Sequence, residues 1–208
     1  MYIYIIDDDD AVRESTELLL STSSFDASIQ TFASAEDFFS EDLLGHSGCV
    51  LLDIRMPGMD GVEALKKITA SDSNLVVVMI SGHGDIPKAV ETMKAGAFSF
   101  VEKPFSDTAI TEVVTSALQQ SEAQQEEAEL RTHAIAAIEK LTPREKEVLD
   151  KLVLGLLNKV IAYELGISTR TVEVHRARIM EKLDVRSLPE MVRLCLLADG
   201  KDNALAAT

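Results

Sequence analysis

The first 118 residues alternate short runs of hydrophobic and β-branched residues with longer segments of helical periodicity. The runs near residues 50 and 75 are continuously apolar, as expected of strands that helices cover on both faces. The intervening segments are long enough for right-handed crossovers between parallel strands. This pattern predicts an α/β domain with a doubly wound, five-stranded parallel sheet. The predicted strands are Ile3–Ile6, Ala27–Thr31, Cys49–Asp53, Leu75–Ile80 and Ser99–Glu102.

The segment from Asp107 to about Ile138 has a helical and increasingly polar pattern. Its middle, Gln119–Glu127, contains no Gly or Pro, a composition that favours a helix over a flexible linker. We predict that the last helix of the first domain continues into a helical connector. An apolar stripe on this connector is too irregular for a coiled coil. It consists of Leu118, Ala128, Leu130, Ile135 and Ile138.

A second helical region begins at Thr142-Pro143-Arg144-Glu145, which has the pattern of a capping box with proline at the first helical position. The pattern stays helical to about Leu197, apart from a break at Gly166-Ile167-Ser168. We therefore predict an α/β domain, a helical linker and an all-α domain, at residues 1–120, 121–139 and 140–208.

The formal charge of −15, read as a single number, argues against a nucleic-acid-binding protein. The charge is unevenly distributed, however. Residues 1–139 hold 8 Lys and Arg against 25 Asp and Glu, or −17, whereas residues 140–208 hold 12 against 10, or +2. An acidic region joined to a mildly basic one indicates two domains with different functions.

Cys49 and Cys195 lie far apart in apolar contexts and are expected to be reduced core thiols. The longest apolar run, Leu75–Ile80, is far shorter than a membrane helix, and the first residues lack the pattern of a secretory signal. A cytoplasmic protein is therefore expected.

Polar side chains follow the ends of the predicted strands. Asp7-Asp8-Asp9-Asp10 follows the first strand, Asp53 ends the third, and Ser81 and Lys103 follow the fourth and fifth. Because these ends meet at one edge of a doubly wound sheet, we expect a cluster of carboxylates with one hydroxyl and one ammonium. Mg²⁺, which prefers oxygen ligands, would neutralise the repelling carboxylates. A metal beside a nucleophilic aspartate, with a lysine and a hydroxyl to hold phosphoryl oxygens, is a phosphoryl-transfer site.

These residues resemble those of the receiver domains of two-component response regulators. The resemblance rests on Asp7-Asp8, on Asp53 within Leu52–Gly61, on Ser81 before Gly82, and on Lys103-Pro104-Phe105. It implies a flavodoxin-like (βα)5 fold in which Asp53 is the phosphoacceptor and the bond before Pro104 is cis. It implies Mg²⁺ ligands as well: Asp7, Asp8, Asp53 and the main-chain carbonyl of Arg55. The residues that contact the phosphoryl group or respond to it are implied to be Ser81, Lys103 and, at the family's aromatic switch position, Phe100.

Simpler interpretations apply to some neighbouring residues. Asp9 and Asp10 are expected to stabilise a helix N-terminus, and Asp60 is expected to cap the next helix. Phe100, taken alone, also fits a core residue. His83 is expected to be a loop residue and not a ligand.

Residues 158–183 have the pattern of two short helices joined by a tight turn. Gly166 allows the turn, and Ser168 caps the second helix. The second helix has a basic outer face, which suits the major groove of DNA. Positions expected to face inward are Ile161, Ala162, Leu165, Val172, Ile179 and Leu183.

This region resembles LuxR-type helix-turn-helix output domains, and the whole chain resembles the FixJ-like branch of the FixJ/NarL response regulators. The supporting motifs are Leu141–Glu145, Asn158-Lys159, Thr171–Arg176 and Arg186-Ser187. By position, the residues that reach base edges are Glu173, Val174 and Ala177. Those that contact phosphates or position the helix are Lys159, Thr169, Arg170, Thr171, His175, Arg176, Arg178 and Lys182. Lys182 also fits a solubilising surface charge, and Glu173 also fits an orienting partner of Arg176.

The combined pattern predicts a DNA-binding transcriptional response regulator that is not an enzyme, apart from slow self-dephosphorylation of Asp53. A sensor histidine kinase is expected to phosphorylate Asp53. Phosphorylation is expected to alter the face formed by the fourth helix and the fifth strand, Ser99–Glu102, and to favour a homodimer there. The dimer would bind promoter DNA more tightly, as an activator. RNA polymerase is a further candidate partner, and no membrane contact is expected.

Two other functions fit part of the pattern. An aspartate-nucleophile phosphatase of similar architecture would place a second acid two residues past Asp53, where this chain has Arg55. A guanidinium cannot protonate a leaving group at neutral pH, which argues against that enzyme. An adaptor that binds protein instead of DNA is left open by the modest +2 charge of residues 140–208.

Overall fold

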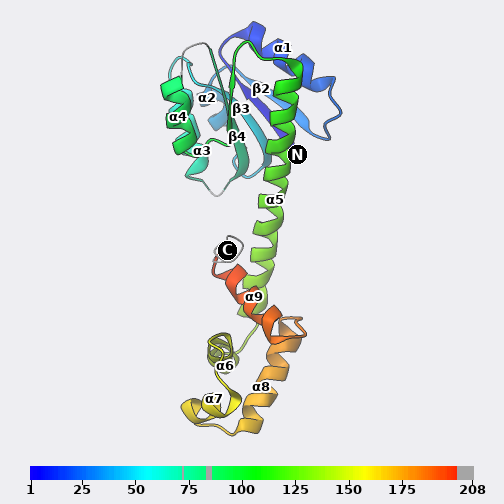
Figure 1. The fold of residues 1–208 in the computed structure, drawn as a ribbon, viewed down its shortest axis with the longest axis vertical. Helices are drawn as coiled ribbons and strands as arrows, with labels where there is room; N and C mark the ends of the chain where they lie inside the picture. Colours follow the sequence, from blue (N-terminus) through cyan, green and yellow to red (C-terminus); the bar gives the residue numbers. More distant parts are fainter. Residues whose placement is uncertain (72, 83–85, 201–208) are drawn as a thin grey trace. The chain divides into compact units, whose positions relative to one another are not determined.

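The computed structural model of the chain describes residues 1–71, 73–82 and 86–200 (Figure 1). The chain divides into two compact units, Met1–Gln125 and Glu126–Thr208. Helix α5 (Asp107–Glu139) begins in the first unit and ends in the second, so the predicted helical continuation is confirmed. Ser121 on α5 still belongs to the first unit, because its buried hydroxyl donates a hydrogen bond of 2.6 Å to the main-chain carbonyl of Asn74.

The first unit is built on a parallel five-stranded sheet in the order β2-β1-β3-β4-β5, which confirms the predicted fold class. The strands are β1 (Tyr2–Ile6), β2 (Ser28–Phe32), β3 (Ser47–Asp53), β4 (Asn74–Ser81) and β5 (Ser99–Glu102). β3 and β4 are buried almost throughout, which explains their uninterrupted apolar sequences. Because all strands run in the same direction, the residues that follow β1, β3, β4 and β5 meet at one edge.

Helices cover both faces of this sheet (Figure 1). Leu20 on the first helix and Ile110 on α5 pack in the apolar core on one face, and Phe38 and Leu65 pack in the core on the other. This two-sided cover leaves the strand ends as the place where polar side chains gather. The remaining helices of the unit are α1 (Asp10–Ser21), α2 (Ala35–Ser40), α3 (Gly61–Thr69) and α4 (Ile86–Lys94).

Side-chain caps mark where three of these helices begin. Asp9 accepts hydrogen bonds from the amides of Ala11 and Val12 at the start of α1, and Ser34 caps α2. Asp60 caps α3 by accepting from the Glu63 amide at 2.8 Å. Asp10 lies in the first turn of α1. The predictions that Asp9 and Asp10 lie at a helix N-terminus and that Asp60 caps a helix are therefore confirmed.

Up to residue 200, where the description ends, the second unit contains the end of α5 and four further helices: α6 (Pro143–Val153), α7 (Asn158–Leu165), α8 (Thr169–Lys182) and α9 (Leu188–Ala198). Thr142 and Glu145 form the predicted capping box at α6. Gly166 ends α7 in the left-handed conformation with φ 66°, and Ser168 caps α8, both as predicted. Gly166 and Ser168 thus form the turn between α7 and α8, at the positions that the sequence predicts.

The cores of the two units account for most of the apolar positions. In the second unit Val172, Ile179 and Leu183 are buried, as predicted, and Leu118 and Ile138 on α5 pack against the first and the second core respectively. The other members of the predicted connector stripe behave differently, because Leu130 and Ile135 are exposed.

Neither cysteine is in a disulfide; Cys49 is buried and Cys195 is half-buried. Among the helices within the described residues, none combines the length and the apolar composition that crossing a membrane requires.

Candidate functional site

The carboxyl edge of the sheet brings Asp7, Asp53 and Lys103 together, as the sequence predicts. Asp7 directly follows β1, Asp53 ends β3 and Lys103 directly follows β5. The ammonium of Lys103 donates to Asp7 Oδ2 at 2.6 Å and to Asp53 Oδ1 at 2.5 Å. Both carboxylates are buried, with exposed fractions of 2% and 5%. One cation is thus shared by two desolvated anions.

Main-chain amides hold the two remaining carboxylate oxygens. Asp53 Oδ2 accepts from the Arg55 amide at 2.6 Å, and Asp7 Oδ1 accepts from the Asp9 amide at 3.0 Å. Burial nevertheless raises the pKa of Asp53, because desolvation outweighs the hydrogen bonds from Lys103 and Arg55, and Asp7 adds a like charge. The pKa of Lys103 is raised, since its hydrogen bonds to the two aspartates outweigh its own desolvation. The cluster therefore favours a further positive charge.

Three other predicted residues of this pocket have different surroundings. Ser81 is buried at the end of β4, beside β3, where Asp53 pairs with Ile80. Asp8 is exposed, as is Arg55. The Lys103–Pro104 peptide bond is cis, as the family resemblance implies.

The side chains of this pocket offer oxygen donors for a divalent cation. Within residues 1–71, 73–82 and 86–200, no group of three or more Asp, Glu, His or Cys side chains is arranged to hold a metal ion. A smaller set remains suitable for Mg²⁺, which keeps several waters and takes one or two carboxylates. Asp7 and Asp53 are buried carboxylates that share a single ammonium, so they fit such a cation in charge and in donor type.

Two residues that support this edge of the sheet were not predicted. Arg13 Nη1 donates to the main-chain carbonyl of Asp7 at 2.7 Å. Glu36 Oε1 accepts from the Met59 amide at 2.7 Å and so ties α2 to the segment that follows Asp53. The sequence offers a weak signal for Arg13, which is the first basic residue after the aspartate run. It offers none for Glu36, because that contact spans 23 residues.

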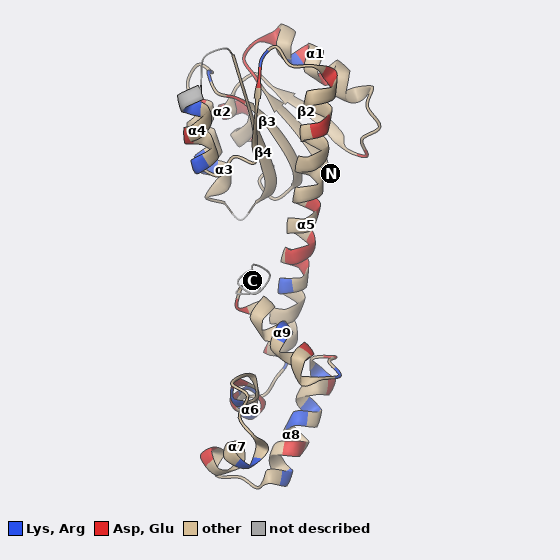
Figure 2. Cartoon of the chain, in the orientation of Figure 1, with Lys and Arg blue, Asp and Glu red and all other residues tan. Residues whose placement is uncertain are grey.

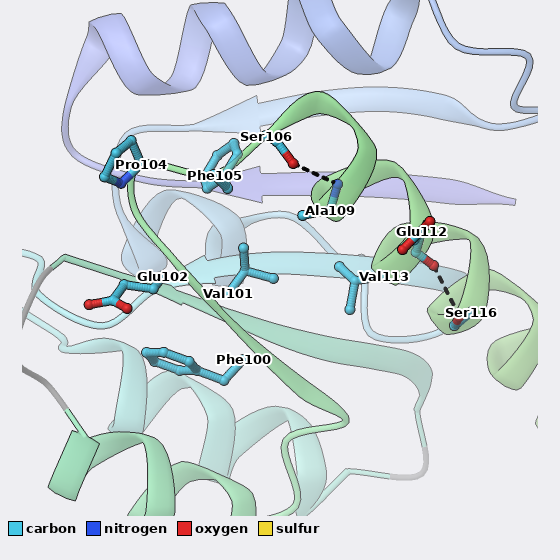
Figure 3. Close-up of a pocket in the computed structure, with 10 residues that line it drawn as sticks. All are labelled: Phe100, Val101, Glu102, Pro104, Phe105, Ser106, Ala109, Glu112, Val113 and Ser116. Carbon is cyan, nitrogen blue, oxygen red and sulfur yellow. Dashed lines mark hydrogen bonds between the residues drawn. The ribbon is translucent and has the colours of Figure 1, made fainter.

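Phe100 lies on β5, next to the pocket. Its ring is half-buried and packs against the core shared by α2 and α3. Phe100 also lines one end of a groove of about 540 Å³ beside β5 and α5. Figure 3 shows its ring pointing away from Phe105 and Val113, which line the same groove but pack against the core on the other face of the sheet. Both the switch role and the core role predicted for Phe100 are compatible with this half-buried position.

The neighbouring face of α4 and β5 exposes apolar side chains. Val90 and Met93 on α4 are about half exposed, and Phe98, which precedes β5, is exposed as well. An apolar surface of this kind is typical of a protein–protein contact. The predicted loop residue His83 lies outside the described residues.

The predicted DNA-contacting residues lie mostly on α8, where Lys and Arg occur along the helix (Figure 2). Three members of the set are half-buried: Thr171, His175 and Arg176. The rest are exposed, namely Lys159 on α7 and Thr169, Arg170, Glu173, Val174, Ala177, Arg178 and Lys182 on α8. Since Val172 and Ile179 face the core, the exposed side chains of α8 lie on the outer face of this helix, where DNA can reach them.

Lys182 differs from the other members of this set. Its ammonium donates to the buried carboxylate of Glu145 at 2.7 Å. Glu145 also accepts from the Thr142 amide at 2.8 Å, and these contacts lower its pKa to about 2. Lys182 thus has a structural partner inside the unit, which the helical pattern did not indicate.

Comparison with known proteins gives the same two-part organisation. The model of the response regulator receiver domain matches residues 3–143, and that of the LuxR family of bacterial regulatory proteins matches residues 139–195. The chain is 47% identical to the transcriptional regulatory protein FixJ of Azorhizobium caulinodans, covering 94% of this chain and 92% of that one. It is 39% identical to DctR of Rhodobacter capsulatus, a C4-dicarboxylate transport transcriptional regulatory protein, over 92% and 98% of the two chains.

Solved structures agree with these sequence relatives. The response regulator StyR has a TM-score of 0.79 at 40% identity, covering 93% of this chain and 97% of that one. Full-length FixJ from B. japonicum has a TM-score of 0.57 at 42% identity, covering 96% and 97%. With both domain types present and FixJ proteins similar over most of its length, the chain belongs to the FixJ-like response regulators, transcriptional regulators of two-component systems with a LuxR-type DNA-binding domain.

Proposed function

We propose that a partner histidine kinase phosphorylates Asp53 and that the new charge switches the DNA-binding unit. The observation that carries this proposal is the shared ammonium, with Lys103 Nζ 2.5 Å from Asp53 and 2.6 Å from Asp7. A carboxylate oxygen of Asp53 attacks the phosphorus of the kinase's phosphohistidine, the P–N bond breaks, and the imidazole leaves. The new phosphoryl oxygens are stabilised by the Lys103 ammonium and the Ser81 hydroxyl.

Mg²⁺ completes this proposed site. Its ligands would be Asp7, Asp8, Asp53 and the main-chain carbonyl of Arg55. When bound, the cation neutralises the negative charge that gathers on the phosphoryl oxygens. The support for this metal is electrostatic, because the two buried carboxylates carry more negative charge than Lys103 balances.

Phosphorylation is proposed to favour a homodimer through the face of α4 and β5. The exposed apolar side chains Val90, Met93 and Phe98 support this choice of face. In this proposal Ser81 moves toward the phosphoryl group and Phe100 turns inward, which changes the shape of the same face. Two joined DNA-binding units then gain affinity for a paired site by tethering.

The dimer is proposed to act in the cytoplasm as an activator that recruits RNA polymerase at promoter DNA. The test is to incubate the chain with acetyl phosphate and Mg²⁺ and to measure two quantities. These are the dimer fraction and the affinity for DNA sites that have been selected from random DNA by binding to the chain. Both should rise together. If DNA affinity is unchanged while Asp53 is phosphorylated, the switching mechanism is wrong.

The outer face of α8 provides a prediction about DNA contact. Replacing the exposed Arg178 with alanine is expected to weaken binding and to reduce the slope of log affinity against log salt by about one, because one phosphate contact is lost. Arg193→Ala on α9 is the matched control and should leave the slope unchanged. Gel shifts over a range of salt concentrations measure both. A salt-independent affinity in the wild type would instead favour the adaptor function.

We also propose that the chain is not an enzyme with substrate turnover. The residue two positions past Asp53 is Arg55, whose guanidinium cannot act as a general acid at neutral pH. Slow self-dephosphorylation of Asp53 is compatible with this proposal. Sustained hydrolysis of small phosphate esters by the purified chain would contradict it.

A further inference from the structure

The loop between β3 and α3, residues 54–60, carries part of the proposed metal site. Asp53, which ends β3, and the main-chain carbonyl of Arg55 are two of the proposed ligands. The loop returns close to the strand, because the Gly61 amide donates to the Ile54 carbonyl at 3.0 Å. A Cβ at Gly61 would overlap the main-chain carbonyl of Asp53, so α3 begins directly against the phosphoacceptor. The conformation of this β3–α3 loop therefore decides where the Arg55 carbonyl lies.

One side chain from another element holds the outer part of the β3–α3 loop. Glu36, in the first turn of α2, accepts a hydrogen bond of 2.7 Å from the Met59 amide through Oε1. Its acceptor is an ionised carboxylate, and hydrogen bonds of this kind are stronger than those between neutral groups. The contact spans 23 residues of sequence, so it ties the loop to a separate part of the fold.

Gly58 gives the Glu36 carboxylate the room that this contact needs. Gly58 has a φ of 77°, a conformation that residues with a Cβ rarely adopt. A Cβ at this position would overlap Glu36 Oε1, so the carboxylate lies directly against the main chain of the loop. Glu36 and Gly58 thus form one contact, made from both of its sides.

The residues between Arg55 and Met59 transmit this restraint to the metal site. Met56 is buried in the core with an exposed fraction of 7%, and the ring of Pro57 fixes its φ. Gly58 is the conformationally free residue of this segment, because it lacks a side chain. The carboxylate from α2 removes that freedom by holding the next amide, that of Met59. A change at Met59 is therefore passed along the chain to the Arg55 carbonyl.

We propose that Glu36 is a positioning residue for the metal-assisted phosphorylation of Asp53. It holds the β3–α3 loop so that the Arg55 carbonyl is in place before Mg²⁺ binds. This inference rests on the proposed function and adds to it a residue that touches neither the cation nor the phosphoryl group. Without Glu36, part of the free energy of Mg²⁺ binding goes into ordering the loop, and the affinity falls.

The test is a titration of the full chain with Mg²⁺, followed by the NMR chemical shifts of the amides in the β3–α3 loop. Glu36→Ala is expected to weaken Mg²⁺ binding about threefold to tenfold, below the roughly tenfold to hundredfold loss that follows when a direct support of a metal ligand is removed. Glu36→Gln keeps an oxygen acceptor for the Met59 amide, so its affinity should stay within about twofold of the wild type. Asp37→Asn is the matched control, because it removes a negative charge from the same helix and leaves the Met59 contact in place.

Phosphorylation by acetyl phosphate gives a second readout of the same contact. At low Mg²⁺, the Glu36→Ala chain should be phosphorylated more slowly by the factor that its Mg²⁺ affinity has lost. Saturating Mg²⁺ should restore the wild-type rate, because Glu36 affects how readily the site forms and not the groups that react. The Tm should change little, since the hydrogen bond that is lost is exposed.

Three results would overturn the inference. The first is an equal Mg²⁺ affinity in Glu36→Ala and the wild type. The second is a loss in Glu36→Gln as large as that in Glu36→Ala, because the charge of the carboxylate would then be responsible and not its hydrogen bond. The third is a wild-type chain that binds no Mg²⁺, in which case the proposed metal site itself fails.

Discussion

Replacing Asp53 with asparagine is expected to abolish the response to acetyl phosphate, both in dimer fraction and in DNA affinity. The amide cannot attack phosphorus, and the gain from tethering two DNA-binding units, on the order of tenfold or more, is lost with the dimer. Size-exclusion chromatography and gel shifts, with and without acetyl phosphate and Mg²⁺, measure the two effects. The residual affinity of the variant should equal that of the untreated wild type.

The Asp53→Asn variant should also be at least as stable as the wild type. Burial raises the pKa of Asp53, so its charged form is less favourable in the folded than in the unfolded chain, and this penalty is present at neutral pH. The neutral amide removes it and leaves Lys103 paired with Asp7 alone. Asp60→Asn is the control for stability. It should leave stability unchanged, because asparagine caps α3 as well as aspartate does. A normal response in the Asp53→Asn variant would show that the phosphoacceptor lies elsewhere.

Replacing Glu145 with glutamine is expected to lower the stability of the second unit by about 2 kcal/mol, because it breaks a buried ion pair and leaves Lys182 without its anion. Glu147→Gln on the same helix is the matched control. Its ion pair with Arg144 is exposed, so the change should stay within about 0.5 kcal/mol. Hydrogen exchange of the α6 and α8 amides in the full chain measures both, with the amides of the first unit as an internal reference.

The ion pair of Glu145 with Lys182 also makes the stability of the second unit depend on pH. The Lys182 ammonium and the Thr142 amide lower the pKa of Glu145 in the folded chain to about 2, below its ordinary value of 4.5. The stabilisation is therefore complete above pH 4.5 and disappears as the pH falls toward 2. The stability difference between wild type and Glu145→Gln should shrink over this range. A difference that stays constant with pH would mean that the ion pair does not stabilise the unit.

Most of the fold follows from patterns that act over short distances along the chain. The apolar runs at β3 and β4, the capping box at Thr142, and Gly166 with Ser168 each constrain a few consecutive residues, and each leads to the predicted element. The meeting of Asp7, Asp53 and Lys103 in one pocket was also predictable, for a topological reason. The carboxyl ends of parallel strands lie at the same edge of a sheet. Once five parallel strands are assigned, the residues that follow them must therefore lie close together.

Contacts between distant side chains did not follow from these patterns. Helical periodicity shows that Lys182 lies on the outer part of α8, but not that its ammonium reaches Glu145, 37 residues earlier. The same holds for Glu36 and the Met59 amide. Periodicity specifies which face of a helix is buried, whereas the partner of a long polar side chain depends on how helices pack against one another.

The sequence of this chain was thus sufficient to establish two domains, their element types, the acidic pocket around Asp53 and the basic helix α8. These features depend on local propensity, strand topology and charge composition. Three-dimensional packing was required to show that Lys103 bridges Asp7 and Asp53, that Lys182 is tied to Glu145, and that Leu157 and Tyr163 on α7 are exposed. These features depend on distances between elements and on solvent exposure, which arise when the elements come together.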